Sequence, residues 1–209
     1  MSKDHGHRLV EVADELRAIA TNGLRWSATE YDEARYHKTM SLAAELLGMV
    51  DTRSAEKIER VFRGDLGIRT PFVGVDGAVF DAEGKLLLIQ RKDNGSWAMP
   101  GGAADVGEPP SAVAVREVWE ETGLRVRAVR LVGVYDSRLV GSPDAVHLYH
   151  LVFMCERESG ELTLTNETIA FGYFSEEEAA GLTLHRGHGA RIPDAFAMWR
   201  GETGEAVFQ

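Results

Sequence analysis

The sequence has few of the features that mark secreted, membrane or nucleic-acid-binding proteins. Its 209 residues include one cysteine, Cys155, so no disulfide can form within the chain and a cytoplasmic location is expected. Cys155 ends an apolar run, which favours a buried small side chain over a catalytic thiol. Lysine and arginine number 23 against 33 acidic residues, a formal net charge of −10. Because phosphate contacts need a positive field, we expect no nucleic-acid partner.

Long apolar runs are also absent. None reaches the ~18 residues that a membrane-spanning helix needs. Residues 1–20 are charged and lack the apolar core of a signal peptide, so we expect neither an export signal nor a membrane partner. The hydrophobic fraction of 44% and the charged fraction of 27% are typical of globular proteins. The length suits one domain, or one domain with a small appendage.

The first third of the chain predicts helices. Apolar residues recur at helical spacing over residues 7–23, where Gly23 is expected to end the helix, and again over about 28–49. A shorter helix follows Ser54, a residue type that caps helix N-termini. Turn formers gather at 64–71, where we place a domain boundary. The sequence therefore predicts a small all-helical domain over residues 1–66 and a second domain over 67–209.

Beyond Pro71 the apolar pattern changes to that of strands. Residues 72–91 predict a strand, a turn and a strand. Further strands are predicted at 125–136, 145–156 and 162–174, and a last helix lies within 185–200. The predicted fold class is α+β.

Between the strands stands a helix with a high density of like charge, predicted from about Pro110 to Thr122. Glu117, Glu120 and Glu121 share one of its faces. The opposite arc, expected to pack on the domain, consists of Ala112, Val115, Val118, Trp119 and Thr122. Carboxylates at this spacing repel one another, and a hard divalent cation with oxygen ligands would turn the repulsion into binding. A solvated acidic helix without a ligand is the alternative.

The acidic helix belongs to a longer pattern with fixed spacing. Gaps of five, seven, one and one residues separate Gly102, Glu108, Arg116-Glu117-Val118, Glu120-Glu121 and Gly123-Leu124. Every fixed position of the Nudix box is filled, so the chain resembles the Nudix hydrolases. The resemblance implies an α/β/α sandwich around a mixed sheet. It also implies Mg²⁺- or Mn²⁺-dependent hydrolysis of a nucleoside diphosphate linked to another moiety.

The resemblance also implies roles for the residues of the box. Glu120 and Glu121 would be the main metal ligands, together with the carbonyl of Gly102. Glu117 would be a further ligand or the base that activates water, and Arg116 would orient Glu117 by ion pairing. Glu108 would be structural, bonding the loop or the arginine.

A catalytic acid outside the box is predicted at Glu167, which precedes an aromatic pair in the position where many family members carry a second acid. Its alternative is a solvated loop residue. Arg69, Arg91, Asp136 and Arg138 are candidate substrate contacts, and each is equally well explained as a surface charge. His185 and His188 lie in a glycine-rich loop and could contact substrate, although no motif supports this prediction.

Residues 8–50 resemble the small helical N-terminal domain of one bacterial Nudix subfamily. Its members hydrolyse ADP-ribose or CDP-alcohols such as CDP-choline. The resemblance implies a homodimer, with the helical domain serving in dimerisation or as a cap on the substrate side. Two alternatives differ in function: a catalytically silent Nudix-fold ligand sensor, and a pyrophosphatase that removes unwanted nucleoside triphosphates or dinucleotides. The intact box and the charge of −10 disfavour the sensor.

Overall fold

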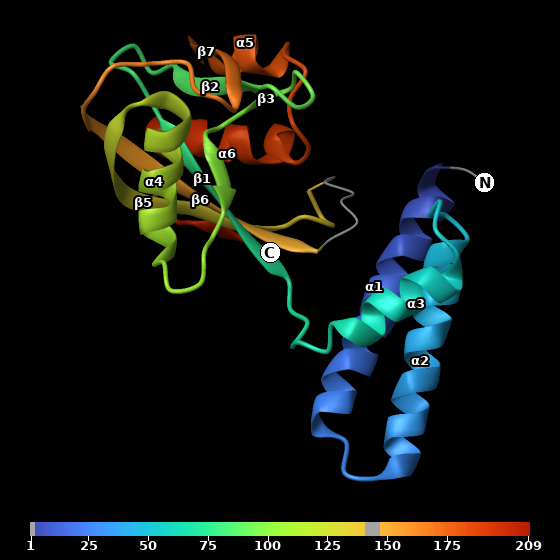
Figure 1. Cartoon of the computed structure of the whole chain (residues 1–209). Coiled ribbons are helices and arrows are strands. Elements are labelled where there is room, and N and C mark those ends of the chain that lie inside the picture. The colour runs from blue at the N-terminus through green and yellow to red at the C-terminus, as the bar shows by residue number, and fades with distance from the viewer. Residues whose placement is uncertain (1–2, 141–146) are drawn as a thin grey trace. The chain divides into compact units, whose positions relative to one another are not determined.

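The computed structural model describes residues 3–140 and 147–209 and contains two compact units (Figure 1). Of the described residues, those up to Pro71, together with His147, form the first unit, whereas 72–140 and 148–209 form the second. The division therefore falls beside Pro71, at the end of the turn-rich segment 64–71.

The first unit consists of three packed helices. They are α1 (Lys3–Trp26), α2 (Glu30–Gly48) and α3 (Ala55–Gly64). Side chains cap two of them: Thr29 accepts a hydrogen bond from the N–H of Asp32, and Ser54 accepts one from the N–H of Lys57. The buried core of the unit consists of Ala20, Met40, Ala43, Ala44, Ile58 and Phe62.

Gly23 does not end the first helix, and that prediction is wrong. α1 continues to Trp26, and a Cβ added at Gly23 would lie 2.3 Å from the ring of Tyr36 in α2. The glycine therefore permits a close approach of two helices. Such a contact is set by tertiary packing, which the local sequence does not reveal.

The second unit contains two sheets and three helices. The strands are β1 (Phe72–Val79), β2 (Leu86–Arg91), β3 (Trp97–Ala98), β4 (Gly101–Ala103), β5 (Arg125–Asp136), β6 (Leu148–Ser159), β7 (Thr168–Phe174) and β8 (Val207–Phe208). The helices are α4 (Pro110–Thr122), α5 (Glu176–Ala180) and α6 (His188–Trp199). One sheet has the strand order β4-β1-β6-β5-β8 and the other β3-β2-β7. The larger sheet is mixed, because β1 is parallel to β6 and antiparallel to β4.

Helices α4 and α6 cover opposite faces of the larger sheet. Along β1, Val75 and Val79 pack with α4, whereas Ala78, on the other face, belongs to the core that contains α6. Residues of β6 alternate in the same way, with Cys155 on the α4 side and Val152 on the α6 side. The result is the α/β/α arrangement of the predicted α+β fold, which is confirmed.

The predicted bounds of the other helices and strands agree with the structure to different degrees. The helix 110–122 and the strand 125–136 have the predicted bounds. The strand expected from residue 162 begins only at Thr168, and the first two residues of the strand predicted over 145–156 lie outside the described residues. Helix α5 was not predicted, although Ser175 and Glu178 form a capping box at its start. The short strands β3, β4 and β8 were missed as well.

Two predictions about apolar segments can be compared with the structure. Cys155 is buried, and burial raises the pKa of its thiol to about 12, which fits a packed side chain and not a nucleophile. Among the helices of residues 3–140 and 147–209, none combines the length and the apolarity that a bilayer crossing requires.

Candidate active site

The acidic helix α4 begins and ends where its flanking residues favour a boundary. Pro110 is its first residue, a position where the missing N–H costs little. Gly123 follows its last residue in the left-handed conformation, with φ of 79°, which glycine adopts without strain. Local chemistry therefore sets both ends of the helix.

The packed face of α4 is rotated from the predicted one. The buried residues are Val113, Ala114, Val118, Glu121 and Thr122. Ala112 and Trp119 are exposed, so the prediction that they pack on the domain is wrong; Trp119 lies beneath the guanidinium of Arg125, 4.4 Å from ring centroid to Cζ. The rotation moves Glu121 to the inner edge of the helix, where it is 5% exposed. The side chain of Glu120 is 47% exposed.

Arg116 connects the acidic residues of the box. Its Nε and Nη2 donate to the two carboxylate oxygens of Glu108, both at 2.9 Å. Its Nη1 donates to Glu117 at 2.7 Å and to Glu120 at 3.0 Å. The contacts expected for Glu108 and Glu117 are therefore present. They raise the pKa of Arg116, Glu108 contributing most, and they lower the pKa of Glu108.

Two glycines bring the preceding strand close to the helix. The N–H of Gly101 donates to Oε2 of Glu121 at 2.8 Å. A Cβ added at Gly101 would lie 2.4 Å from the carbonyl oxygen of Val75, and one added at Gly102 would lie 2.4 Å from Oε1 of Glu117. Neither position has room for a side chain. The glycines thus allow backbone polar groups to reach the carboxylates.

A cavity of about 450 Å³ opens beside the inner carboxylate of the helix. This carboxylate cavity is lined by Arg91, Lys92, Asp93, Glu121, Asn166 and Glu167. Strand pairing accounts for the meeting of its walls, because Arg91 is opposite Thr168 and the N–H of Lys92 donates to the carbonyl oxygen of Glu167 at 3.0 Å. The structure therefore brings the predicted acid Glu167 and the predicted phosphate contact Arg91 to the same place as Glu121.

Glu121 at this cavity and Glu117 beside it are both carboxylates whose negative charge is disfavoured by burial and by neighbouring acids. Burial raises the pKa of Glu121 to about 7; the Gly101 N–H opposes the shift, and the charge of Glu117 adds to it. Burial also raises the pKa of Glu117, where Arg116 opposes the shift and Glu120 and Glu167 add to it. A cation placed among these groups would relieve both the desolvation and the repulsion.

The donor set fits a hard cation, although the carboxylates are engaged elsewhere. In the described part of the chain, no three His, Cys, Asp or Glu side chains converge closely enough to hold a metal ion as they stand. Arg116 holds Glu117 and Glu120, and Gly101 holds Glu121. Oxygen donors on one helix face, with a backbone carbonyl beside them, are ligands that Mg²⁺ and Mn²⁺ accept.

Comparison with known proteins decides the family. Residues 70–195 match the model of the NUDIX domain, and residues 7–62 match that of the UDP-X-like, N-terminal oligomerisation domain. The chain belongs to the Nudix family. A Bacillus subtilis relative named "Putative ADP-ribose pyrophosphatase YjhB" is 31% identical over 200 residues, covering 95% of this chain and 96% of the relative. The chain is accordingly a Nudix pyrophosphohydrolase with a helical N-terminal domain, and the ligand-sensor alternative has no support.

Solved structures show the same architecture. A Nudix structure from Streptococcus suis, titled as an ADP-ribose pyrophosphatase, is 31% identical, with a TM-score of 0.59; the match covers 67% of this chain and all of that one. A structure titled UDP-X diphosphatase is 23% identical, with a TM-score of 0.62, over 98% of this chain and 99% of that one. At that identity the second match speaks for the fold alone, including the helical unit.

Three of the four predicted substrate contacts lie away from the carboxylate cavity or have other partners. Arg69 belongs to the helical unit, where its guanidinium donates to Asp14 at 3.0 Å. Asp136 ends β5, and its carboxylate accepts a hydrogen bond from the N–H of Arg138 in the turn that follows; neither residue lines the carboxylate cavity. Arg91 does line the cavity, where its guanidinium pairs with the carboxylate of Asp93 at 2.9 Å.

A second, smaller cavity of the Nudix unit brings together Arg91, His185 and His188, and two residues that sequence reasoning missed, Asp76 and Arg191. This histidine cavity, of about 190 Å³, adjoins Gly101 and Gly102 and shares Arg91 with the carboxylate cavity. Its polar side chains are Asp76, Arg91, His150, His185, His188 and Arg191. The only available signal was the presence of charged residues at core positions, because Asp76 lies in an apolar strand and Arg191 in an apolar helix.

The floor of the histidine cavity is an ion pair that joins β1 to α6. The guanidinium of Arg191 is fully buried and donates to the carboxylate of Asp76. It also donates to the carbonyl oxygens of Gly187 at 3.2 Å and Arg186 at 3.3 Å, and contacts Nδ1 of His188 at 3.0 Å. Burial and the charge of Arg191 hold the pKa of His188 well below its ordinary value, so the imidazole is neutral at pH 7.

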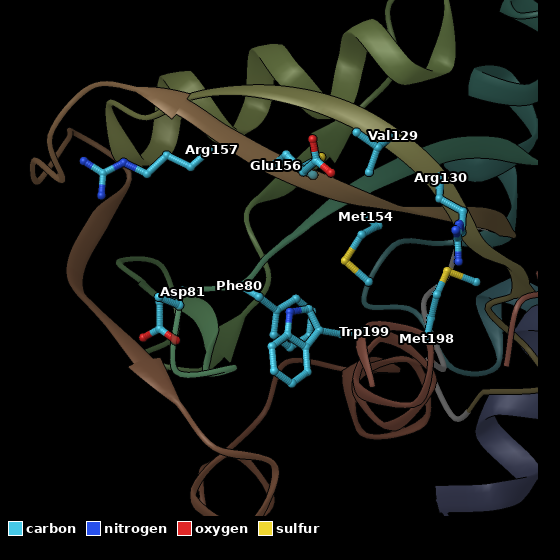
Figure 2. A pocket seen from close by; sticks show the side chains of 11 residues that line it. Phe80, Asp81, Val129, Arg130, Met154, Glu156, Arg157, Met198 and Trp199 are labelled. Atoms are coloured by element: carbon cyan, nitrogen blue, oxygen red, sulfur yellow. The ribbon is translucent and has the colours of Figure 1, made fainter. Parts of the chain in front are cut away.

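A cavity of about 650 Å³ on another part of the Nudix unit contains none of the box residues (Figure 2). The rings of Phe80 and Trp199 stack there with centroids 5.4 Å apart, beside Met154 and Met198. Since none of the predicted site residues lines this cavity, the chemistry is assigned to the carboxylate and histidine cavities.

Proposed function

We propose that this Nudix enzyme is a Mg²⁺- or Mn²⁺-dependent hydrolase of a nucleoside diphosphate linked to another moiety. ADP-ribose and CDP-alcohols such as CDP-choline are the candidate substrates. The observation that carries the proposal is the meeting of Glu121, Arg91 and Glu167 at one cavity beside the box. Relatives named as ADP-ribose pyrophosphatases support this substrate class.

The metal ligands in this proposal are Glu117, Glu120, Glu121 and the carbonyl of Gly102. When bound, the metal would supply positive charge that offsets the negative charge developing on the phosphate. Arg116 would orient Glu117, which it contacts at 2.7 Å.

We assign the general base to Glu167. The alternative, Glu117, has one carboxylate oxygen engaged by the guanidinium of Arg116 at 2.7 Å and is one of the proposed metal ligands. Glu167 is exposed at the carboxylate cavity and, within the described residues, forms no ion pair. It is therefore free to approach a water molecule that stands against the substrate.

The reaction that these residues serve is a substitution at phosphorus. A water oxygen attacks one phosphorus of the diphosphate, and the bond from that phosphorus to the bridging oxygen breaks. The proton of the water passes to Glu167, and the products are a nucleoside monophosphate and the phosphorylated moiety. Arg91, at the rim shared by both cavities, would bind a phosphate oxygen of the substrate.

We also propose that the helical unit forms a homodimer. It matches the model of an N-terminal oligomerisation domain, and apolar residues such as Trp26 and Tyr31 are 75% and 81% exposed on it. Sedimentation velocity of the full chain should give twice the mass of one chain. A single species of monomer mass across the accessible concentrations would contradict the dimer.

The test of the function is a substrate screen with Mg²⁺ and product identification. ADP-ribose, CDP-choline, other nucleotide sugars, deoxynucleoside triphosphates and dinucleoside polyphosphates would be compared by kcat/KM. We expect a diphosphate-linked substrate to be best, with a nucleoside monophosphate among the products. Reaction in ¹⁸O-water then shows which phosphorus is attacked. Preference for a triphosphate, with release of pyrophosphate, would favour the alternative of nucleotide removal.

The matched variant for this screen is Glu120→Gln. It keeps the shape of an exposed side chain and removes one proposed ligand, so turnover should fall by orders of magnitude while the fold is retained. Glu156→Gln, a change at an exposed acid that pairs with Arg127 on the sheet surface, should leave turnover unchanged. Turnover of Glu120→Gln near that of the wild type would contradict the metal site.

A further inference from the structure

The histidine cavity contains a buried donor whose hydrogen bond is missing. Nε2 of His188 is buried and has no hydrogen-bond partner in the described residues. The nearest carboxylate oxygen, Oδ1 of Asp76, is 3.8 Å away, beyond hydrogen-bond range. Native proteins rarely leave such a group unpaired, which suggests that a ligand or a water molecule completes it.

The contact with Arg191 identifies this nitrogen as a donor. A guanidinium has only N–H donors, so Nδ1 of His188, 3.0 Å from Nη2 of Arg191, must accept. A neutral imidazole that accepts at Nδ1 carries its proton on Nε2. The histidine therefore presents an N–H to the cavity, and its partner must be an acceptor.

The rest of the ion pair keeps this donor in place. Arg191 is fixed by Asp76 and by two carbonyl oxygens of the loop that leads into α6, and it is fully buried. Arg191 and Asp76 are thus positioning residues, which set the tautomer and the orientation of His188 without needing to touch a ligand.

Size and charge restrict what enters the cavity. Its volume of about 190 Å³ is close to that of cavities that hold a single ring, so one sugar fits and a whole nucleotide does not. The charges of Asp76 and Arg191 offset each other, and His188 is neutral, so the floor suits uncharged hydroxyl groups. A quaternary ammonium group offers no acceptor and would face the guanidinium of Arg91.

We propose that the Nε2–H of His188 donates to a hydroxyl oxygen of a sugar in the substrate's second moiety, so that the enzyme selects nucleoside diphosphate sugars over CDP-choline. This inference rests on the proposed function and narrows it. A site that hydrogen-bonds a substrate hydroxyl discriminates strongly against an analogue that lacks it.

The test compares ADP-ribose with CDP-choline in wild type and three variants. His188→Leu should lower kcat/KM for ADP-ribose by about 10- to 100-fold, the loss expected for one buried hydrogen bond, and leave CDP-choline hydrolysis within about twofold. His188→Gln, which keeps an N–H at similar reach, should restore much of the ADP-ribose activity. His37→Leu is the matched control, because Nδ1 of His37 contacts a guanidinium, that of Arg63, at 2.9 Å in the helical unit.

Two further measurements do not depend on activity. Calorimetry with the inactive Glu120→Gln enzyme should show that adding His188→Leu weakens ADP-ribose binding about 10- to 100-fold and does not weaken CDP-choline binding. The ¹⁵N spectrum of histidine-labelled protein should show His188 protonated on Nε2, and that signal should shift with ADP-ribose. Thermal unfolding of each variant establishes that it is folded.

The possible results distinguish failure of the sugar contact from failure of the proposed hydrolase function. Equal loss for both substrates in His188→Leu, or a His188 proton on Nδ1, would overturn the sugar contact and leave the hydrolase intact. A wild type that prefers CDP-choline would do the same. A wild type that turns over no diphosphate-linked compound would instead remove the proposed function itself.

Discussion

The carboxylate of Glu121 accepts a hydrogen bond from the backbone N–H of Gly101 at 2.8 Å. The last acid of the box is thereby joined to the strand that precedes the helix, although twenty residues separate the two in sequence. Glu121 is also the most buried of the three helix carboxylates, so its charge is the least solvated.

Glu121→Gln should distinguish the contribution of Glu121 to stability from its contribution to turnover. The amide oxygen of glutamine can still accept from Gly101, and the change removes a charge that Glu117 and Glu167 repel. We expect the metal-free variant to unfold at the temperature of the wild type or above it, while turnover falls by orders of magnitude. Calorimetry and a turnover assay on the same preparation check this. A large drop in unfolding temperature would show that the charge itself holds the fold.

Mg²⁺ should stabilise the wild-type protein against unfolding. An ion that binds only the folded state adds about 2.7 kcal/mol at a concentration of 100 times its Kd. The effect should vanish in Glu121→Gln and Glu117→Gln and persist in Glu156→Gln, whose changed residue lies on the exposed sheet surface. Thermal unfolding over a Mg²⁺ titration measures it. The same stabilisation in all four proteins would place the cation elsewhere.

Glu167→Gln should lower kcat and spare binding. Loss of a general base costs about 10²- to 10⁴-fold in rate, whereas the proposed contact of Arg91 with a phosphate would be unchanged. Glu161→Gln is the control, because it changes another exposed acid of the same connecting segment. Single-turnover rates with ADP-ribose distinguish the two variants. If both retain the wild-type rate, the base is another group, Glu117 being the remaining candidate.

Gly102→Ala should damage the site more than the fold. Its Cβ would lie 2.4 Å from Oε1 of Glu117, and the carboxylate must move to make room. Misplacement of a catalytic group by about 1 Å can cost about 100-fold in rate. Gly204→Ala, where a Cβ meets nothing within 4 Å, is the control. Wild-type turnover of Gly102→Ala would mean that Glu117 tolerates displacement.

The stability of the enzyme should fall on the acid side because of His188. Burial lowers its pKa most, the charges of Arg191, His185 and His150 lower it further, and the backbone of Arg186 opposes the shift without reversing it. Below about pH 6.5 the unfolded chain takes up a proton that the folded protein excludes, so the unfolding free energy falls by up to about 1.4 kcal/mol per pH unit. Urea unfolding of wild type and His188→Gln measures the difference. Parallel pH profiles would show that His188 is not the group responsible.

Sequence reasoning succeeded where a feature depends on neighbouring residues. Pro110 and Gly123 act on the backbone beside them, so the bounds of α4 were predictable. The orientation of α4 was not, because which of Val113 and Trp119 faces inward depends on the sheet against which the helix packs. The meeting of Glu167 with Arg91 at one cavity likewise depends on the pairing of β2 with β7.

The ion pair of the histidine cavity is the part of the site that the sequence could not predict. Asp76 and Arg191 are 115 residues apart, and each taken alone is only a charged residue in an apolar element. Their pairing, and the donor that it leaves on His188, emerge only when α6 is packed on the sheet. Resemblance to a family located the carboxylates of the box, but it gave no indication of these residues.

The contacts of Arg116 also determine how the box would meet a cation. One guanidinium pairs with Glu108, Glu117 and Glu120, and its single positive charge offsets part of their combined negative charge. A cation that binds these carboxylates would have to displace the guanidinium of Arg116. Its affinity would therefore be the difference between the binding free energies of the cation and of the guanidinium for the same carboxylate oxygens. At the proposed metal site, occupancy would then depend on the divalent ion concentration, and Arg116 would set the concentration at which the ion takes its place.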